Sequence, residues 1–357
     1  MSLEQSIFSS LGKRWRDAVE QDRVTVVEDP ARAQGGFNVS FISGAEYEQA
    51  RKLKRTLIRR YQGRTLEEVI PGEEQRSRRG ACYCVANHHP ADIARPSRSE
   101  ARDRILSDLK LLYGVGPHRE SALKRQGYRT IEDLTRHPHH RDSAEELLRL
   151  LDDFDTGGLI DVIARKGRRS SPSILHVSGF HDLEDFVFLD IETLGLAGVP
   201  IILFGVAWIE GGRIQVHQYL LRDIREESAA LEGFFTHVRE NSVFITYNGR
   251  IFDVPYIKSR AAYYGIRADL DRPHYDLLHF SRRAWRDRLP NCRLSTVESY
   301  LTGAEREDDV PGALVPDFYQ TYLRTGNPGT LVPIVYHNRQ DLVALAAIYT
   351  RLWEEWG

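Results

Sequence analysis

Three apolar segments between residues 186 and 220 constrain the fold of this chain most strongly. They read FVFLDIE, IILFGVAWIE and RIQVHQYLL, and the adjacent glycines Gly211 and Gly212 separate the second from the third. Short apolar runs bounded by turn residues indicate buried strands, and a two-residue glycine turn is typical of a hairpin. A helix-like segment, EESAALEGFFTHVREN, and another apolar run, SVFITYN, follow. The pattern predicts an α/β domain with a mixed sheet flanked by helices.

The first of these segments ends with two acids. In FLDIETLGL, Asp190 and Glu192 stand two residues apart in an otherwise apolar run and precede Gly195. Side chains alternate along a strand, so both carboxylates leave it on the same face. A buried carboxylate is costly unless its charge is compensated. The two acids are therefore either ligands of a shared cation or an ordinary strand end entering solvent, and this motif alone favours neither.

Two more acids occupy comparable positions further along the chain. In TYNGRIFDVPYI, Asn248 follows a predicted strand and Asp253 begins a predicted helix. In YHNRQDLVAL, His337 and Asp341 are four residues apart and share one helix face. A two-metal site stabilises both the attacking and the leaving oxygen of a phosphodiester displacement. Two Mg²⁺ or Mn²⁺ ions suit oxygen ligands, so we expect them at the four acids, which are Asp190, Glu192, Asp253 and Asp341.

A glycine-rich turn lies upstream, in GVGPHRESALKRQGYRTIEDL. Gly114 and Gly116 stand between two predicted helices, where backbone N–H groups are available to a phosphate. Pro117 suits a first helical turn, Gly127 a helix C-terminus, and Thr130 the N-cap of a following helix. The segment resembles the helix-hairpin-helix family, whose members grip the nucleic-acid backbone without reading its sequence. Some members only pack against protein, so both roles stay open.

The length of 357 residues indicates two or three domains. We expect an N-terminal region of uncertain fold over 1–100, a helical domain with the glycine turn over 101–165, and the α/β domain over 180–357. Within the first region, GGFNVSFI is a strand candidate and AEYEQARKLKRTLIRRYQG a helix candidate. The basic stretch 166–172 is a linker candidate.

Composition favours a cytoplasmic protein. The net charge is −2, but the first half of the chain is basic and the second half acidic, which suits a module that grips a polyanion beside a site that collects cations. No apolar run approaches the roughly 20 residues of a membrane span, and the N-terminus lacks the pattern of a secretory signal. Three cysteines do not suggest a disulfide framework.

The acidic motifs resemble those of DEDD-type 3′–5′ exonucleases of the ribonuclease H-like superfamily. LDIETLGL is similar to their first motif, TYNGRIFDVPYI to the second motif as found in proofreading domains of family B DNA polymerases, and YHNRQDLVAL to the third. With YDLLHFSRRAW, CRLSTVESYL and the glycine turn, the chain resembles in particular the bacterial YprB-like proteins, from about residue 65 to its end.

The resemblance implies a ribonuclease H-like mixed sheet and makes the four acids metal ligands. It also implies that Leu194, Leu196 and Asn248 border the 3′-terminal nucleotide. In the family, the residue that orients the attacking water is a tyrosine four residues before the last acid or a histidine five before it. Here His337 stands four before and Tyr336 five before. We expect His337 to be the general base, because the i−4 position faces the same way as the ligand, and Tyr336 is its rival.

These features predict a metal-dependent 3′–5′ exonuclease that acts on nucleic acid, with DNA favoured over RNA. Two alternatives stay open: an endonuclease selective for nucleic-acid structure, and a non-catalytic nucleic-acid-binding protein on the same fold. The sequence predicts no membrane partner.

Overall fold

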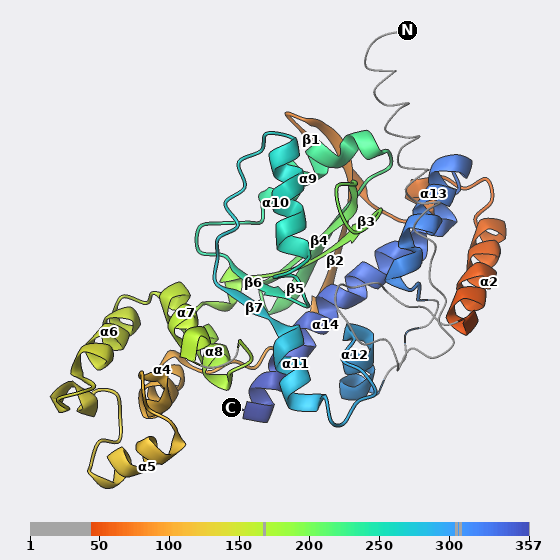
Figure 1. Ribbon diagram of the computed structural model, residues 1–357. Coiled ribbons are helices and arrows are strands. Elements are labelled where there is room, and N and C mark those ends of the chain that lie inside the picture. The colour runs from red at the N-terminus through yellow and green to blue at the C-terminus, as the bar shows by residue number, and fades with distance from the viewer. Residues whose placement is uncertain (1–43, 167–168, 304–305, 307–308, 357) are drawn as a thin grey trace.

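A mixed sheet forms the centre of the structure, a computed structural model that describes residues 44–166, 169–303, 306 and 309–356 (Figure 1). In that part of the chain the sheet has seven strands in the order β1-β2-β5-β4-β3-β6-β7. The strands are β1 (Glu73–Ser77), β2 (Gly80–Pro90), β3 (Phe186–Thr193), β4 (Ile201–Glu210), β5 (Arg213–Leu220), β6 (Val243–Thr246) and β7 (His274–Asp276).

The predicted α/β architecture is confirmed. Strands β3, β4 and β5 form an antiparallel meander, and β6 returns parallel to β3 through helix α9 (Glu227–Phe235). The hairpin between β4 and β5 turns at Gly211 and Gly212, which both have positive φ. Sequence analysis did not predict β7, because a strand of three residues has too few positions to display a period.

The other edge of the sheet comes from the segment whose fold the sequence left open. Strand β2 pairs antiparallel with β5 over residues 83–90, and β1 pairs with β2 at the edge. Cys82 and Cys84 lie in β2 and are buried. Burial raises the pKa of these thiols to about 11 and about 12, so both are protonated at neutral pH. The sheet therefore combines strands that precede the helical region in the sequence with strands that follow it.

The two faces of β3 belong to two hydrophobic cores. Phe186 and Phe188 pack on the side of helix α14 (Val332–Trp356), and Val187 and Leu189 pack on the side of α9 and of α10 (Asp253–Tyr263). Because side chains alternate along a strand, residues 190 and 192 continue the face that looks toward α14.

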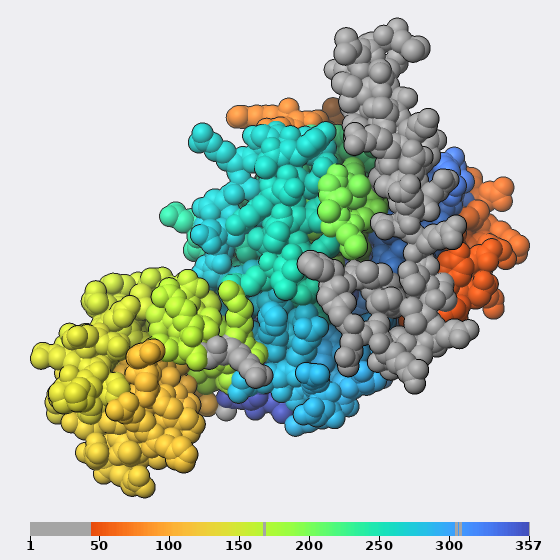
Figure 2. Space-filling view, in the orientation of Figure 1, coloured from red at the N-terminus to blue at the C-terminus, as the bar shows by residue number. Residues whose placement is uncertain are grey.

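The segment between β2 and β3 forms a helical lobe that projects from the sheet (Figures 1 and 2). Its helices are α4 (Arg98–Ser107), η2 (Leu109–Leu111), α5 (Pro117–Arg125), η3 (Asp133–Arg136), α6 (Arg141–Asp152), α7 (Thr156–Lys166), α8 (Pro172–Val177) and η4 (Ser178–Phe180). Pro117 begins α5 as predicted, and Gly127 has φ +98° just past its end. Thr130 and Asp133 form reciprocal capping hydrogen bonds, but the helix that follows is a short 3₁₀ turn.

The remaining helices surround the sheet. They are α2 (Gly44–Arg60), α3 (Leu66–Val69), η5 (Leu183–Asp185), η6 (Ile224–Glu226), α11 (Leu277–Trp285), α12 (Leu294–Thr302), η7 (Gly312–Leu314), α13 (Val315–Thr325) and η8 (Pro328–Leu331). Helix α2 confirms the helix predicted near residue 50, whereas the strand candidate GGFNVSFI lies outside the described residues. None of the helices described here has the length and apolar character that crossing a bilayer requires.

Candidate metal centre

The four predicted acids reach one region of the structure from three elements. Asp190 and Glu192 lie near the end of β3, Asp253 begins α10, and Asp341 lies on α14. Three of them are buried: Glu192 is 8% exposed, Asp253 5% and Asp341 9%. Burial raises the pKa of Asp190 well above its usual range, and the charges of Asp341, Asp253 and Glu192 raise it further. These acids therefore repel one another in a site with little water.

The pKa values of Glu192 and Asp253 are raised as well, partly by the negative charge of the neighbouring acids. Burial raises the pKa of Glu192 to about 8, and the Asp341 and Asp253 carboxylates add to the effect while His337 opposes it. Burial also raises the pKa of Asp253 to about 7, with contributions from Asp276 and Asp341. A cluster of this kind is stabilised by protons or by bound cations.

Asp190 is held by an amide that sequence analysis missed. Asn338 Nδ2 donates hydrogen bonds to Asp190 Oδ2 at 2.8 Å and to the Asp190 carbonyl oxygen at 3.1 Å. Its Oδ1 accepts from Gln218 Nε2 at 2.8 Å. Asn338 is fully buried and faces Gly205 of β4, where an added Cβ would stand 2.3 Å from Asn338 Oδ1. Gly205 therefore makes room for the amide that orients Asp190.

Asp253 is fixed by the backbone of β3. Its Oδ1 accepts a hydrogen bond from the Ile191 N–H at 3.0 Å. Strand β6 pairs with β3 only as far as Phe188, so this N–H has no strand partner on that edge. The contact joins the N-terminus of α10 to the strand segment between Asp190 and Glu192, and the position in the first helical turn also favours a negative charge.

The turn before α10 is held by Asp276. Its Oδ1 accepts from the Asn248 N–H at 2.7 Å and its Oδ2 from the Arg250 N–H at 3.2 Å. Asn248 has φ +68°, a left-handed conformation that asparagine tolerates better than most residues. Sequence analysis did not single out Asp276, because the acid lies in the short strand β7.

His337 faces the acids. Its Nδ1 lies 2.6 Å from Asp309 Oδ1, and its Nε2 lies 3.6 Å from Asp341 Oδ2 and 3.9 Å from Glu192 Oε1. Burial alone would lower the pKa of His337, but Asp341, Asp309 and Glu192 together raise it to about 10. The imidazole is therefore protonated at neutral pH when no other cation is bound.

Tyr336 points elsewhere. Its ring lies under the guanidinium of Arg339, whose Cζ is 5.3 Å from the ring centroid. Of the two rivals, His337 is thus the one that contacts the acids, as helical spacing predicted.

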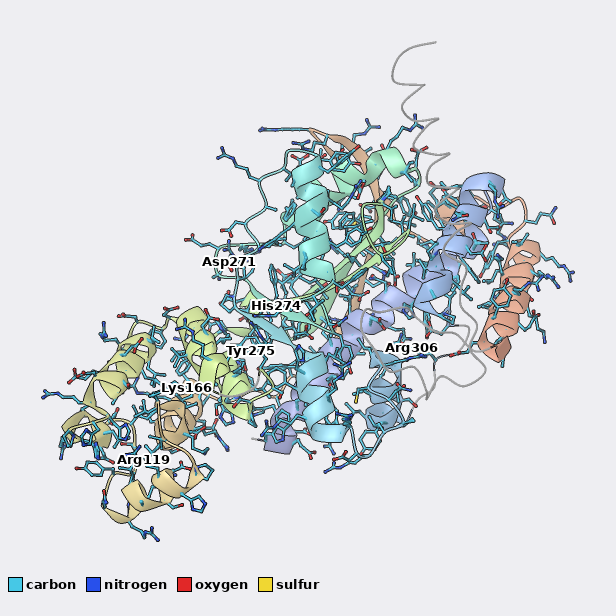
Figure 3. The ribbon with its side chains drawn as sticks, in the orientation of Figure 1. Arg119, Lys166, Asp271, His274, Tyr275 and Arg306 are labelled. Carbon is cyan, nitrogen blue, oxygen red and sulfur yellow. The ribbon has the colours of Figure 1, made fainter. Side chains whose placement is uncertain are left out.

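A second cation enters the cluster from the segment between α12 and α13. This cation is Arg306, which is labelled in Figure 3. Its Nη2 lies 2.6 Å from Asp341 Oδ1, and its Nε donates to Glu298 Oε2 at 2.6 Å. Its side chain is only 7% exposed. The close Arg306–Asp341 contact is an ion pair, and within the described residues neither of its two atoms forms a hydrogen bond. Sequence analysis missed Arg306 and Asp309, since their segment has no periodic pattern.

The donor set fits a hard divalent cation, because four carboxylates offer oxygen ligands and, within the described residues, Asp341 Oδ1 accepts no hydrogen bond. The arrangement is not that of a closed metal cage. Within the described residues, no group of three or more acidic, histidine or cysteine side chains has the geometry to hold a metal ion. Arg306 and His337 supply positive charge at Asp341.

The predicted substrate-binding residues differ in their exposure and in their place in the fold. Leu196 is 59% exposed, whereas Leu194 is 5% exposed and packs in the hydrophobic core. Of these two leucines, Leu196 is therefore the one with exposed apolar surface. Gly114 has φ +74° and Gly116 is the N-cap of α5, in the helical lobe.

Comparison with known proteins agrees with this architecture. The family model described as the ribonuclease H superfamily matches residues 187–353, which form a ribonuclease H-like domain. An uncharacterized protein, YprB of Bacillus subtilis (strain 168), is 31% identical over 231 residues, which are 63% of this chain and 52% of YprB. A DNA polymerase of Pyrococcus glycovorans is 28% identical over 202 residues, 48% of this chain and 25% of the polymerase. The chain thus spans about half the length of YprB and a quarter of the polymerase.

Proposed function

We propose that the protein is a metal-dependent 3′–5′ exonuclease that hydrolyses phosphodiester bonds of nucleic acid. The observation that carries this proposal is the set of four acids, buried or nearly so, that converge from β3, α10 and α14 in a ribonuclease H-like domain. Mutual repulsion of buried carboxylates destabilises the fold, so such a cluster indicates a function that needs its negative charge. In this proposal, that function is the binding of cations.

Asp190, Glu192, Asp253 and Asp341 would hold two Mg²⁺ or Mn²⁺ ions. The chemistry that such ions would supply, when bound, is stabilisation of the attacking and leaving oxygens of the displacement. Asn338 and the Ile191 N–H keep Asp190 and Asp253 in place, so that these two carboxylates do not need to reorganise. Preorganised charge of this kind is the usual source of catalytic power in such sites.

His337 is the general base in this proposal. Its Nδ1–H donates to Asp309, which leaves Nε2 directed at the space beside Glu192 and Asp341. A base so oriented takes the proton of an attacking water at Nε2 while Asp309 holds the ring and its tautomer. This step needs the neutral imidazole, and positive charge bound at the acids would favour that form.

Arg306 neutralises part of the acid cluster in the absence of a cation. It contacts Asp341 and Glu298, and its charge opposes the mutual repulsion of the carboxylates. A cation ligated by Asp341 Oδ1 would take the place of this guanidinium. The planar fork of donors on Arg306 would then suit a phosphate of the substrate.

The 3′–5′ direction rests on the motifs shared with proofreading domains and on the partial similarity to a DNA polymerase. The glycine turn of the helical lobe would add affinity for the nucleic-acid backbone rather than chemistry. DNA is the favoured substrate.

The test uses DNA and RNA labelled at the 5′ end, single- and double-stranded, with Mg²⁺ or Mn²⁺. A ladder that shortens from the 3′ end, abolished by EDTA, is the expected result. Asp190→Asn and Asp253→Asn should lower the rate by orders of magnitude, whereas Asp287→Asn, which removes an exposed acid outside the site, should not. Cutting of circular single-stranded DNA would instead establish an endonuclease, and binding without cleavage by any form would establish a non-catalytic protein.

A further inference from the structure

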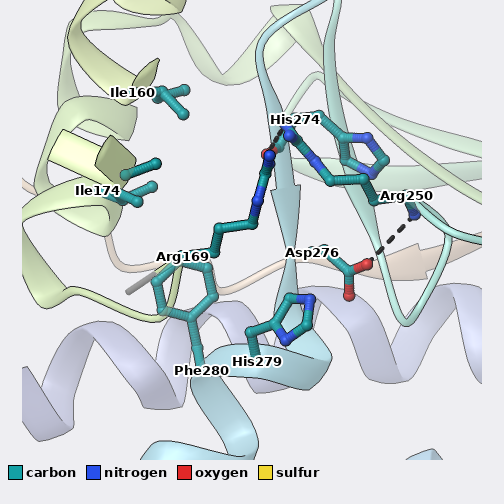
Figure 4. A pocket seen from close by; sticks show the side chains of 9 residues that line it. Ile160, Arg169, Ile174, Arg250, His274, Asp276, His279 and Phe280 are labelled. Atoms are coloured by element: carbon teal, nitrogen blue, oxygen red, sulfur yellow. Dashed lines mark hydrogen bonds between the residues drawn. The ribbon is translucent and has the colours of Figure 1, made fainter. Parts of the chain in front are cut away.

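A second polar site lies where the helical lobe meets the ribonuclease H-like domain. We call it the junction pocket; it is a small cavity of about 20 Å³ that opens to solvent (Figure 4). Its polar lining is formed by Arg169, Arg250, His274, Asp276 and His279, and its apolar lining comes from α7, α8 and α11. None of the four acids of the candidate metal centre lines it.

Arg250 enters the pocket from the turn between β6 and α10. It is partly buried, and its Nη2 donates to the His274 carbonyl oxygen at 3.4 Å. Burial lowers the pKa of Arg250, and the charge of Arg169 lowers it further. Asp161 and Asp271 lie within electrostatic range, but in the part of the chain described here no carboxylate forms an ion pair with Arg250. A partly buried guanidinium without a carboxylate partner is costly.

Asp276 is the acid inside the pocket, and backbone donors already occupy it. Its oxygens accept hydrogen bonds from the N–H groups of Asn248 at 2.7 Å, Arg250 at 3.2 Å and Leu278 at 3.2 Å. The carboxylate therefore fixes the turn that carries Arg250 and caps α11. It fixes the backbone of Arg250 but does not ion-pair with its guanidinium.

Arg169 reaches the same pocket from the opposite side. It belongs to the basic stretch that was predicted as a linker, and its side chain extends toward the guanidinium of Arg250 (Figure 4). Two guanidinium groups directed into one pocket repel each other. An anion between them would remove this repulsion and satisfy donors on both, and a phosphate oxygen pair matches the planar fork of arginine.

We propose that the junction pocket binds one backbone phosphate of the nucleic-acid strand. This assignment of the ligand rests on the proposed function. Arg250 stands three residues before Asp253, so the pocket adjoins the segment that carries a candidate metal ligand. It also lies against α7 and α8 of the lobe that carries the glycine turn. A strand held there runs from the candidate metal centre toward the lobe.

The test measures affinity rather than cleavage. Arg169→Gln, Arg250→Gln and the double variant are titrated with fluorescent single-stranded oligonucleotides of increasing length, in Ca²⁺ and over a series of salt concentrations. Arg78→Gln is the matched control, because Arg78 is exposed in the turn between β1 and β2, at the opposite edge of the sheet from β7. Inorganic phosphate and a nucleoside monophosphate form a separate arm of the titration.

Each arginine variant should weaken binding of the longer oligonucleotides by about ten- to a hundredfold, and the salt slope should fall by roughly one for a single phosphate contact. Binding of the shortest oligonucleotides should stay unchanged, because they do not reach the pocket. Wild-type affinity at every length would overturn the assignment. Weaker binding of inorganic phosphate, with oligonucleotide affinity unchanged at every length, would assign the pocket to a free anion instead. Cleavage by the wild type is measured separately, so a failure of the nuclease proposal can be told apart from a failure of the phosphate-binding proposal.

Discussion

His337 Nδ1 and Asp309 Oδ1 are 2.6 Å apart, and this contact turns the other ring nitrogen of His337 toward Glu192 and Asp341. Tyr336, one residue earlier on α14, stacks under Arg339 instead. The helix thus presents one of the two rival side chains to the acids, and this selection leads to the first prediction.

His337→Gln should lower the cleavage rate by about a hundredfold or more, because general-base catalysis contributes on this scale. Tyr336→Phe should have little effect, since the Tyr336 ring packs against the guanidinium of Arg339. Single-turnover rates with saturating metal give the comparison, and calorimetric titration with Mn²⁺ checks that both variants still bind the cation. If Tyr336→Phe were inactive and His337→Gln active, α14 would present Tyr336 rather than His337 to the substrate.

Asp309→Asn should lower the rate by roughly 10- to 100-fold, the usual cost of removing a partner that orients a functional histidine. Burial opposes ionisation of Asp309, but His337 and Arg306 hold its pKa below the usual range, so the wild-type group is a carboxylate. Its charge raises the pKa of His337. Neutralising it should shift the limb of the pH–rate profile that reports His337 to lower pH. Asp309→Glu, which restores the charge, should recover part of the rate; an unshifted profile in Asp309→Asn would exclude this role.

Metal affinity should rise with pH, and metal binding should release protons. Glu192, with a pKa of about 8, and His337, with a pKa of about 10, both hold protons in the metal-free protein near neutrality. Both folded-state values lie above the unfolded ones. Their contribution to stability is therefore full below the unfolded pKa and is lost as pH rises through about 8 and then about 10.

The increase in melting temperature on adding Mg²⁺ should consequently be larger at pH 8.5 than at pH 6, because a bound cation offsets the repulsion of the deprotonated acids. Calorimetry in two buffers that differ in ionisation enthalpy counts the protons released. Asp253→Asn, which removes one of the coupled acids, should reduce both effects. Equal stabilisation at the two pH values would contradict the charge balance described for this site.

The site residues that could be predicted from the sequence are those that lie in a strand or helix with a clear hydrophobic period. The alternation of β3 placed Asp190 and Glu192 on one face, and helical spacing placed His337 with Asp341; the structure has both. Arg306 and Asp309 lie in a segment without a period, where no local rule connects them to α14.

Asn338 was predictable in principle. A glycine inside the apolar strand IILFGVAWIE often marks a close approach of another group, and Gly205 does face the Asn338 amide. Strand β2 was harder to predict, because its sequence GACYCVANHHP mixes small, polar and apolar residues, and its place beside β5 depends on contacts distant in sequence.

The pairing of Gly205 with Asn338 predicts a specific loss of metal affinity. Gly205→Ala would place a methyl group 2.3 Å from Asn338 Oδ1, so the amide must move and Asp190 loses its donor. Asn338→Leu removes the donor directly and also leaves Gln218 Nε2 with one acceptor fewer. Each change should weaken Mn²⁺ binding by roughly tenfold or more and lower the free energy of unfolding by about 1–3 kcal/mol. Gly312→Ala is the control, because an added Cβ there meets nothing within 4 Å; metal affinity equal to that of this control would refute the coupling.

The glycine turn of the lobe should contribute binding rather than chemistry. Gly114→Ala and Gly116→Ala should weaken duplex binding and reduce its dependence on salt, because a side chain at these positions keeps phosphate away from the backbone N–H groups. Gly114→Ala also strains a residue with φ +74°, so Gly127→Ala, which strains φ +98° at the far end of α5, serves as its control. Cleavage of a short single-stranded oligonucleotide at saturating concentration should change little in all three variants. If Gly127→Ala weakens duplex binding as much as the other two, the turn acts through the folding of the lobe, and its role is to pack against protein.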